Sequence, residues 1–86
     1  MNPISDNLEA LRLFTIGKEI CKKNNNQLGL AEANNNIGLV LASKNEFDSA
    51  EDFFWKSYRY SQKEHDSLAM ATYLNNLGAL SFRKNN

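Results

Sequence analysis

Asn35-Asn36-Ile37-Gly38 and Asn75-Asn76-Leu77-Gly78 are nearly identical tetrapeptides that lie forty residues apart in a chain of 86 residues. When residues 8–46 are aligned with residues 48–86, 10 of the 39 positions are identical. Helical composition alone does not usually give that many identities, and self-similarity at a fixed period is the signature of a repeat architecture. The chain is therefore predicted to contain about two copies of one structural unit.

Each unit is predicted to be a pair of helices. Apolar residues recur with 3.6-residue spacing over about 4–23, 28–43, 46–64 and 67–83, and polar turns separate these ranges. Asn45 is expected to cap the third helix together with Asp48, and Asp66 to cap the fourth. Gly38 lies inside a helix, where glycine costs about 1 kcal/mol relative to alanine, so it needs a packing reason. Because short turns favour antiparallel neighbours, residues 1–86 are predicted to form one all-α domain of four antiparallel helices.

Composition limits the classes of function. Ten basic residues balance ten acidic residues, and no basic stripe is evident along the sequence, so nucleic acid is not an expected partner. No apolar run approaches the roughly 20 residues that span a bilayer, so no membrane partner is expected. Cys21 has no second cysteine with which to form an internal disulfide. It is expected to be a small buried or half-buried thiol, and the chain to be cytoplasmic.

No set of residues predicts catalysis, a cofactor or a metal site. His65 is the only histidine, and no second His or Cys near it completes a usual zinc set, so it is expected in a polar surface turn. Cys21 has no histidine nearby in sequence to activate it as a nucleophile. The glycines fall inside helices and not in a phosphate-binding loop. The chain is predicted not to be an enzyme, with no cofactor and no metal.

Forty residues per helix pair, with small residues where helices must cross closely, resemble the tetratricopeptide repeat family in its longer, forty-residue variety. The residues that match the family pattern are Ile37, Gly38 and Leu41 in the first helix of a unit, and Ala50, Phe54 and Ser57 in the second. Asn34 and Ser81 depart from it, because the family often has bulky apolar residues there. The resemblance implies a segment of a solenoid of helix hairpins. With A and B as the first and second helices of a unit, the chain reads B-A-B-A.

This order implies that both ends of the stack are open. A repeat buries its apolar face only against its neighbours. Leu74, Leu77, Leu80 and Phe82 therefore cannot all be covered by the helices present. We expect either that the chain is a segment of a longer array or that a second copy supplies the missing surface.

The resemblance also implies a binding site, because the A helices of the family line a concave face on which a peptide or a partner helix lies. The candidate contacts are Glu32, Asn35, Asn36, Leu39, Ala42 and Ser43 on one A helix, and Thr72, Asn75, Asn76, Ala79, Phe82 and Arg83 on the next. Related repeats use an asparagine at the place of Asn36 and Asn76 to bond a ligand's main chain, and an amide offers both donor and acceptor. The alternative is that these asparagines bond to neighbouring helices and orient the stack.

Trp55 and Tyr58 form a second candidate interface. Their equivalents in the first copy are Thr15 and Lys18, which indicates a helix face that tends toward solvent. Two aromatic residues three positions apart could anchor a protein contact, since aromatics are enriched in binding hot spots. The alternative is ordinary packing against an adjacent repeat or loop.

The leading functional hypothesis is a non-catalytic module that binds a peptide or a partner helix on the A-helix face. A second hypothesis is a structural scaffold or oligomerisation element that self-associates through its open ends. A third is a sensory or regulatory array attached to a signalling domain elsewhere in a longer protein.

Overall fold

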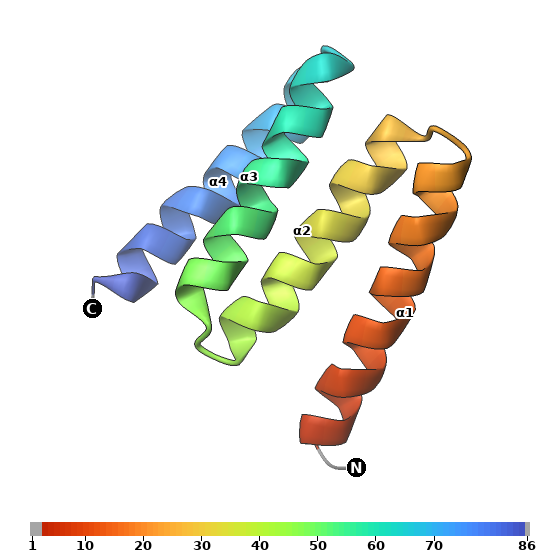
Figure 1. Cartoon of the computed structure of the whole chain (residues 1–86). Helices are drawn as coiled ribbons and strands as arrows, with labels where there is room; N and C mark the ends of the chain where they lie inside the picture. The colour runs from red at the N-terminus through yellow and green to blue at the C-terminus, as the bar shows by residue number, and fades with distance from the viewer. Residues whose placement is uncertain (1–2, 86) are drawn as a thin grey trace.

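A computed structural model describes residues 3–85 of the chain, and the side chains of residues 6–85. It contains four helices, α1 (Pro3–Lys23), α2 (Gln27–Ser43), α3 (Phe47–Lys63) and α4 (Ser67–Lys84), and residues 3–85 contain no strand. Successive helices run in opposite directions (Figure 1). The predicted all-α class is confirmed, and the predicted helix ranges agree with the observed bounds to within one residue at every end.

The three turns that join the helices have the same geometry. Asn25, Asn45 and His65 adopt positive φ angles of 55°, 64° and 54°, at equal intervals of twenty residues. In each turn this residue and the next donate backbone hydrogen bonds to the last turn of the preceding helix, as Asn25 does to Lys22 O and Asn26 to Cys21 O. This is a Schellman ending, which satisfies carbonyl groups that the helix leaves unpaired. Short left-handed turns therefore set the antiparallel hairpins.

The caps of α2 and α4 are alike, but the start of α3 differs from the prediction. Asn26 accepts a hydrogen bond from Gly29 N, and Asp66 accepts one from Ala69 N, as expected for the latter. Asn45 does not cap α3. The N-cap residue of α3 is Glu46, and its side chain makes no capping hydrogen bond. Asn45 cannot take that role because it adopts the left-handed conformation that ends α2. An asparagine suits such a φ better than most residues do.

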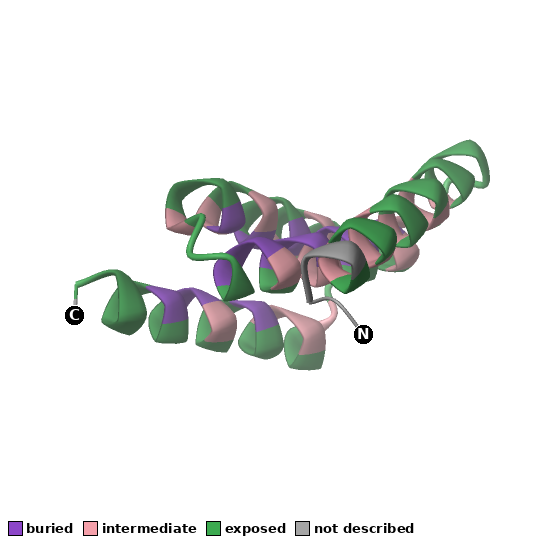
Figure 2. Cartoon of the chain, turned by 90° about the horizontal axis from the view of Figure 1, so that it is seen from below, coloured by how far each residue is buried: buried purple, intermediate pink, exposed green. Residues whose placement is uncertain are grey.

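The helices pack in sequence order, with α2 and α3 at the centre. α3 packs against both α2 and α4, and α1 packs against α2. In Figure 2 the buried residues lie on α2 and on the sides of α3 and α4 that face the core, whereas α1 is only partly covered. None of residues 6–23 is buried. α1 is therefore an edge helix.

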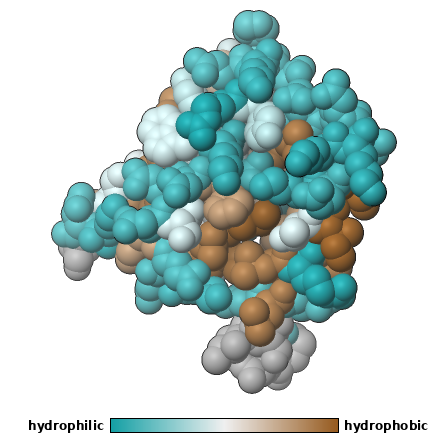
Figure 3. Space-filling view, in the orientation of Figure 1, coloured by the Kyte–Doolittle hydropathy of each residue, from teal (hydrophilic) through white to brown (hydrophobic). Residues whose placement is uncertain are grey.

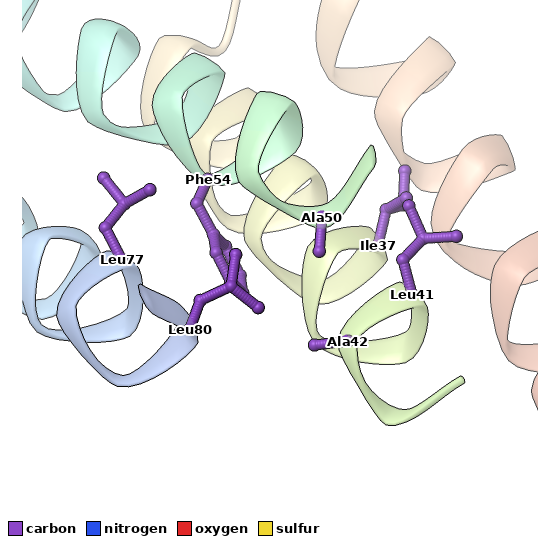
Figure 4. Packing of buried hydrophobic residues seen from close by; sticks show 7 residues of the cluster. All are labelled: Ile37, Leu41, Ala42, Ala50, Phe54, Leu77 and Leu80. Carbon is purple, nitrogen blue, oxygen red and sulfur yellow. The ribbon is translucent and has the colours of Figure 1, made fainter. Parts of the chain in front are cut away.

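Phe54 is the centre of the core. It projects from α3 into the space between α2 and α4, where Leu77 and Leu80 lie beside it (Figure 4). On the other side its ring lies against Gly38, where a Cβ would be 2.6 Å from Phe54 Cε1 and 3.3 Å from Ala50 O. The glycine thus lets α2 and α3 approach closely, which is the packing reason that its place in a helix requires.

The two ends of the stack leave apolar side chains exposed, as expected. Leu77 and Leu80 are buried, whereas Leu74 and Phe82 on α4 are 45% and 72% exposed. On α1 the exposed apolar residues include Leu13, Ile16 and Ile20. Figure 3 shows hydrophobic surface along α1 and between α1 and α2, with hydrophilic surface over the upper part of the same face. None of the helices in residues 3–85 combines the length and the hydropathy needed to cross a bilayer.

Candidate protein-binding face

The predicted contact residues of the two A helices, α2 and α4, lie on neighbouring segments. Two hydrogen bonds join these helices: Asn76 Nδ2 donates to Asn35 Oδ1 at 2.6 Å, and Arg83 Nη2 donates to Ala42 O at 3.1 Å. Both bonds link residues 41 positions apart, so α2 and α4 run parallel in a fixed register. The structure thus brings together two rows of residues that we call the A-helix face: Asn35, Leu39 and Ser43 on α2, and Thr72, Asn75, Asn76, Ala79 and Arg83 on α4. All eight are exposed or half-buried. The ninth predicted residue, Asn36, does not lie on this face.

The four asparagines predicted as contacts have different surroundings. Asn35 and Asn76 are half-buried and bonded to one another, so they hold α2 against α4 in this structure. Asn75 is exposed. Asn36 lies on another side of α2, where it lines a groove against α1. Within this face Asn75 is thus the predicted asparagine most available to a ligand.

A shallow depression lies between the two helices. Its volume is about 70 Å³, and it is lined by Leu39, Ala42, Phe54, Asn76, Ala79, Leu80 and Arg83. Small-molecule sites usually measure roughly 300–1,000 Å³, so this depression is too small for an organic cofactor. It has the scale of a place for one side chain of a larger partner.

Arg83 is fixed at one end of the depression. Besides its bond to the carbonyl oxygen of Ala42, its guanidinium lies 5.2 Å from the centre of the Phe47 ring. The Ala42 carbonyl belongs to the last turn of α2 and also accepts a hydrogen bond from the backbone N–H of Asn45. Since a guanidinium has five N–H donors, Arg83 retains others that could bind a partner.

Ser43 and Thr72 lie at opposite ends of the face, and both hydroxyls are already engaged. Ser43 Oγ donates to Val40 O at 2.6 Å, and Thr72 Oγ1 donates to Leu68 O at 3.0 Å. These bonds stay within one helix. The two residues therefore frame the face, and neither lines the depression.

Tyr73 is the buried titratable group of α4. It is only 7% exposed, and burial raises its pKa, with further contributions from the negative charges of Glu32 and Asp66. Its phenol therefore stays neutral through the physiological range, because an ordinary tyrosine pKa is already about 10.

Trp55 and Tyr58 form a separate aromatic pair on α3. Their rings meet edge to face, with centroids 5.7 Å apart and an angle of 84° between the planes. Trp55 is 38% exposed and Tyr58 is half-buried. This arrangement is stabilising by itself, by roughly 0.5–1.5 kcal/mol beyond burial, so packing within α3 accounts for part of the pair's role.

A groove between α1 and α2 was not predicted from the sequence. It measures about 310 Å³ and is lined by Leu13, Phe14, Gly17, Cys21, Asn26, Gly29, Glu32, Ala33 and Asn36. The repeat contains the signal that predicts it. Gly17 is equivalent to Ser57, whose hydroxyl donates to Ala31 O across the α2–α3 interface at 2.7 Å, whereas a Cβ on Gly17 would meet nothing within 4 Å.

The groups considered for chemistry lie apart. His65 is exposed in the turn before α4, and Cys21 is a half-buried free thiol next to Gly29. Within the residues that the structure describes, no three His, Cys, Asp or Glu side chains gather in a group able to hold a metal ion.

No protein-family model, curated protein or solved structure matches the chain. The likeness to tetratricopeptide repeats accordingly rests on the sequence motifs described above.

Proposed function

We propose that this chain is a tetratricopeptide-like, non-catalytic module that binds a peptide or a partner helix on its A-helix face. The observation that carries the proposal is the parallel register of α2 and α4, which places Leu39, Ala79 and Arg83 around one depression. Leu39 is 47% exposed and supplies apolar surface, Arg83 supplies charge, and Asn75 supplies an amide. An apolar contact with a polar surround is typical of protein-recognition sites.

Blocking the depression is the direct test. Ala79→Glu places a charged side chain on its rim without removing a buried group, since Ala79 is exposed. The matched control is Ala71→Glu, at another exposed alanine of the same helix that does not line the depression. Peptides are first selected from a random display library on the wild-type chain. We expect Ala79→Glu to weaken their binding by more than about tenfold, which is about 1.4 kcal/mol, while Ala71→Glu retains it.

Two results would contradict the proposal: no peptide is enriched, or both variants bind the selected peptides as the wild type does. Circular dichroism shows whether each variant keeps its helices. Asn76 is less suitable for this test because its loss would also remove the hydrogen bond to Asn35 between α4 and α2.

Self-association is a second candidate function, and the equivalence of the two open ends favours it. Phe54, Ser57 and Ala31 meet at the α2–α3 interface. Their equivalents Phe14 and Gly17 line the open groove of α1, and Ala71 lies exposed on α4. The α4 helix of one copy could therefore pack on α1 of the next by repeating the α2–α3 interface. A head-to-tail contact of this kind is heterologous, so the mass would grow with concentration to a ring or to an open filament.

Light scattering across a concentration series tests this candidate. We expect the mean mass to rise with concentration, and Ala71→Glu to abolish that rise while Ala79→Glu preserves it. A constant monomer mass at the highest concentration would exclude self-association. The same two variants thus separate the two candidate functions, because each serves as the control for the other.

A further inference from the structure

Half of the chain's basic residues surround one cavity that is lined by residues of α1, α2 and α3. The cavity measures about 390 Å³ and is lined by Lys18 and Lys22 of α1, Leu30 and Asn34 of α2, and Lys56, Arg59, Tyr60 and Lys63 of α3. Five of the ten Lys and Arg residues are in this set. No basic stripe is evident along the sequence because these residues come from two separate helices. Helix packing creates a local positive site in a chain of zero net charge.

The positive charges of this cavity are not neutralised by ion pairs. Among the described residues, the salt bridges join Arg12 to Glu9, and Lys84 to Asp48 and Glu51. None of them involves a residue of the cavity. Lys18 and Lys56 instead lie 5.3 Å and 4.5 Å from the centre of the same Phe53 ring. The Phe53 ring thus attracts both ammonium groups and holds them near the cavity, and neither ammonium group is paired with a carboxylate of residues 6–85.

The charges are close enough to affect one another. Burial lowers the pKa of Lys18, and the charges of Lys56 and Lys22 lower it further, while Glu19 acts in the opposite direction. A bound anion would offset both the burial and the repulsion, because an opposite charge within a few ångströms favours the charged form.

The floor of the cavity contains a buried polar atom without a partner. Asn34 is completely buried, and its Nδ2 donates to Leu30 O at 2.9 Å. Its Oδ1 has no hydrogen-bond partner among the described residues. A buried acceptor that stays unpaired costs roughly 1–3 kcal/mol. A donor supplied by a water, or by a hydroxyl or N–H group of a ligand, would recover that cost.

We propose that this cavity binds a phosphomonoester, with the phosphate held by the five cations and an attached organic group against Leu30 and Tyr60. A phosphomonoester carries a charge of about −1.5 to −2 at neutral pH and three acceptor oxygens, which suits several lysines and one arginine. The volume lies within the range of roughly 300–1,000 Å³ that is usual for small-molecule sites. The site is distinct from the A-helix face and adds a ligand class to the proposed function.

Nucleic acid fits these observations less well. A strand needs positive charge that follows its backbone over several nucleotides. Here five of the ten basic residues surround one cavity. The other five basic residues and the ten acidic residues give the rest of the chain a net charge of −5. A compact dianion suits positive charge that is concentrated around one cavity.

The source of the phosphomonoester can be a free small molecule or a phosphorylated side chain. Two probes separate these sources: phenyl phosphate, and the peptide Gly-Gly-phosphotyrosine-Gly-Gly. Both are titrated into the isotopically labelled chain at low ionic strength and followed by NMR. We expect saturable shifts of the Asn34 side-chain amide and of the Leu30 backbone amide. Tighter binding of the peptide would identify a phosphoprotein source, and tighter binding of phenyl phosphate a small-molecule source; both support the phosphomonoester site.

Matched charge variants test the location. Lys56→Gln with Lys63→Gln removes two charges of the cavity, and Lys23→Gln with Lys44→Gln removes two charges outside it. All four lysines are exposed, and Lys23 is the repeat equivalent of Lys63 at the end of α1. We expect the first pair to weaken phenyl phosphate binding by about tenfold or more and the second to change it by less than about twofold.

Several results would overturn the proposal. The first is the absence of saturable shifts at millimolar concentrations of the probe. The second is an equal loss of affinity in both double variants. The third is stronger binding of an oligothymidylate than of phenyl phosphate, with the Lys23/Lys44 pair contributing as much to that binding as the Lys56/Lys63 pair. Because all substitutions are at exposed positions, loss of folding is not expected, and circular dichroism of each variant checks this.

Discussion

Replacing each repeated glycine with alanine should have opposite effects at Gly38 and Gly78, although the two positions are equivalent in sequence. At Gly38 the added Cβ would lie 2.6 Å from Cε1 and 2.8 Å from Cδ1 of Phe54. Ordinary carbon–carbon contact is about 3.5–4.0 Å, so the ring would have to move by about 1 Å. Phe54 is 2% exposed and packs in one cluster with Leu77 and Leu80, so that movement displaces other core residues.

The magnitudes follow from two opposing effects. Overpacking a core costs about 1–3 kcal/mol, whereas alanine gains about 1 kcal/mol over glycine inside a helix. For Gly38→Ala we therefore expect a net loss of about 1 kcal/mol. At Gly78 a Cβ would meet nothing within 4 Å, so only the helical gain of about 1 kcal/mol applies. In a domain of this size each effect shifts the melting temperature by about 4–8 °C, downward for Gly38→Ala and upward for Gly78→Ala.

Urea and thermal unfolding followed by circular dichroism measure both changes. The protein is studied at the lowest practical concentration, so that any contact made by the exposed face of α4 does not contribute. Gly17→Ala is a further control, because a Cβ there also meets nothing within 4 Å. If Gly38→Ala stabilised the chain as much as Gly78→Ala, the close approach of α2 and α3 would not be the reason for the glycine.

Three further predictions concern the core and the A-helix face. A double-mutant cycle of Asn35→Ala and Asn76→Ala should give a coupling of about 1 kcal/mol in urea unfolding, and additive effects would mean that their hydrogen bond does not stabilise the stack. Phe54→Ala should cost about 3–5 kcal/mol and Phe82→Ala less than about 0.5 kcal/mol; similar losses on thermal unfolding would contradict the described core. The raised pKa of Tyr73 means that the folded protein holds the phenolic proton more tightly than the unfolded chain does. The resulting contribution to the free energy of unfolding is complete below about pH 10 and is lost as the pH rises through the folded pKa. The unfolding free energy of the wild type should therefore fall more steeply above about pH 10 than that of Tyr73→Phe, and parallel curves would contradict the assigned cause.

Helix caps and turns were predictable where residues close together in the sequence determine them. Asp66 could be assigned as a cap because the side chain and the amide that it satisfies are three residues apart in sequence. Asn45 was misassigned because two local roles compete for it. A cap for α3 and a left-handed end for α2 both suit asparagine, and the second role is the one it adopts.

The candidate sites were less predictable because their residues belong to different helices. Repeat register placed Leu39 and Ala79 on neighbouring A helices, but did not show that Asn76 bonds to Asn35. It also did not bring together Lys18 and Lys56, which are 38 positions apart in sequence and lie over one Phe53 ring. Such contacts depend on the angle and the offset at which helices pack.

The sequence by itself determined the helices, their turns and the repeat, because hydrophobic periodicity, caps and turn residues act over a few neighbouring positions. Tertiary structure alone decided which of two equivalent glycines is covered, which asparagines bond to one another and where the basic residues gather. The physical reason is that identical sequence positions in the two copies have different neighbours. Gly38 has α3 beside it and Gly78 has open space within the described chain, so the same residue has a packing role in one copy and an open surface in the other.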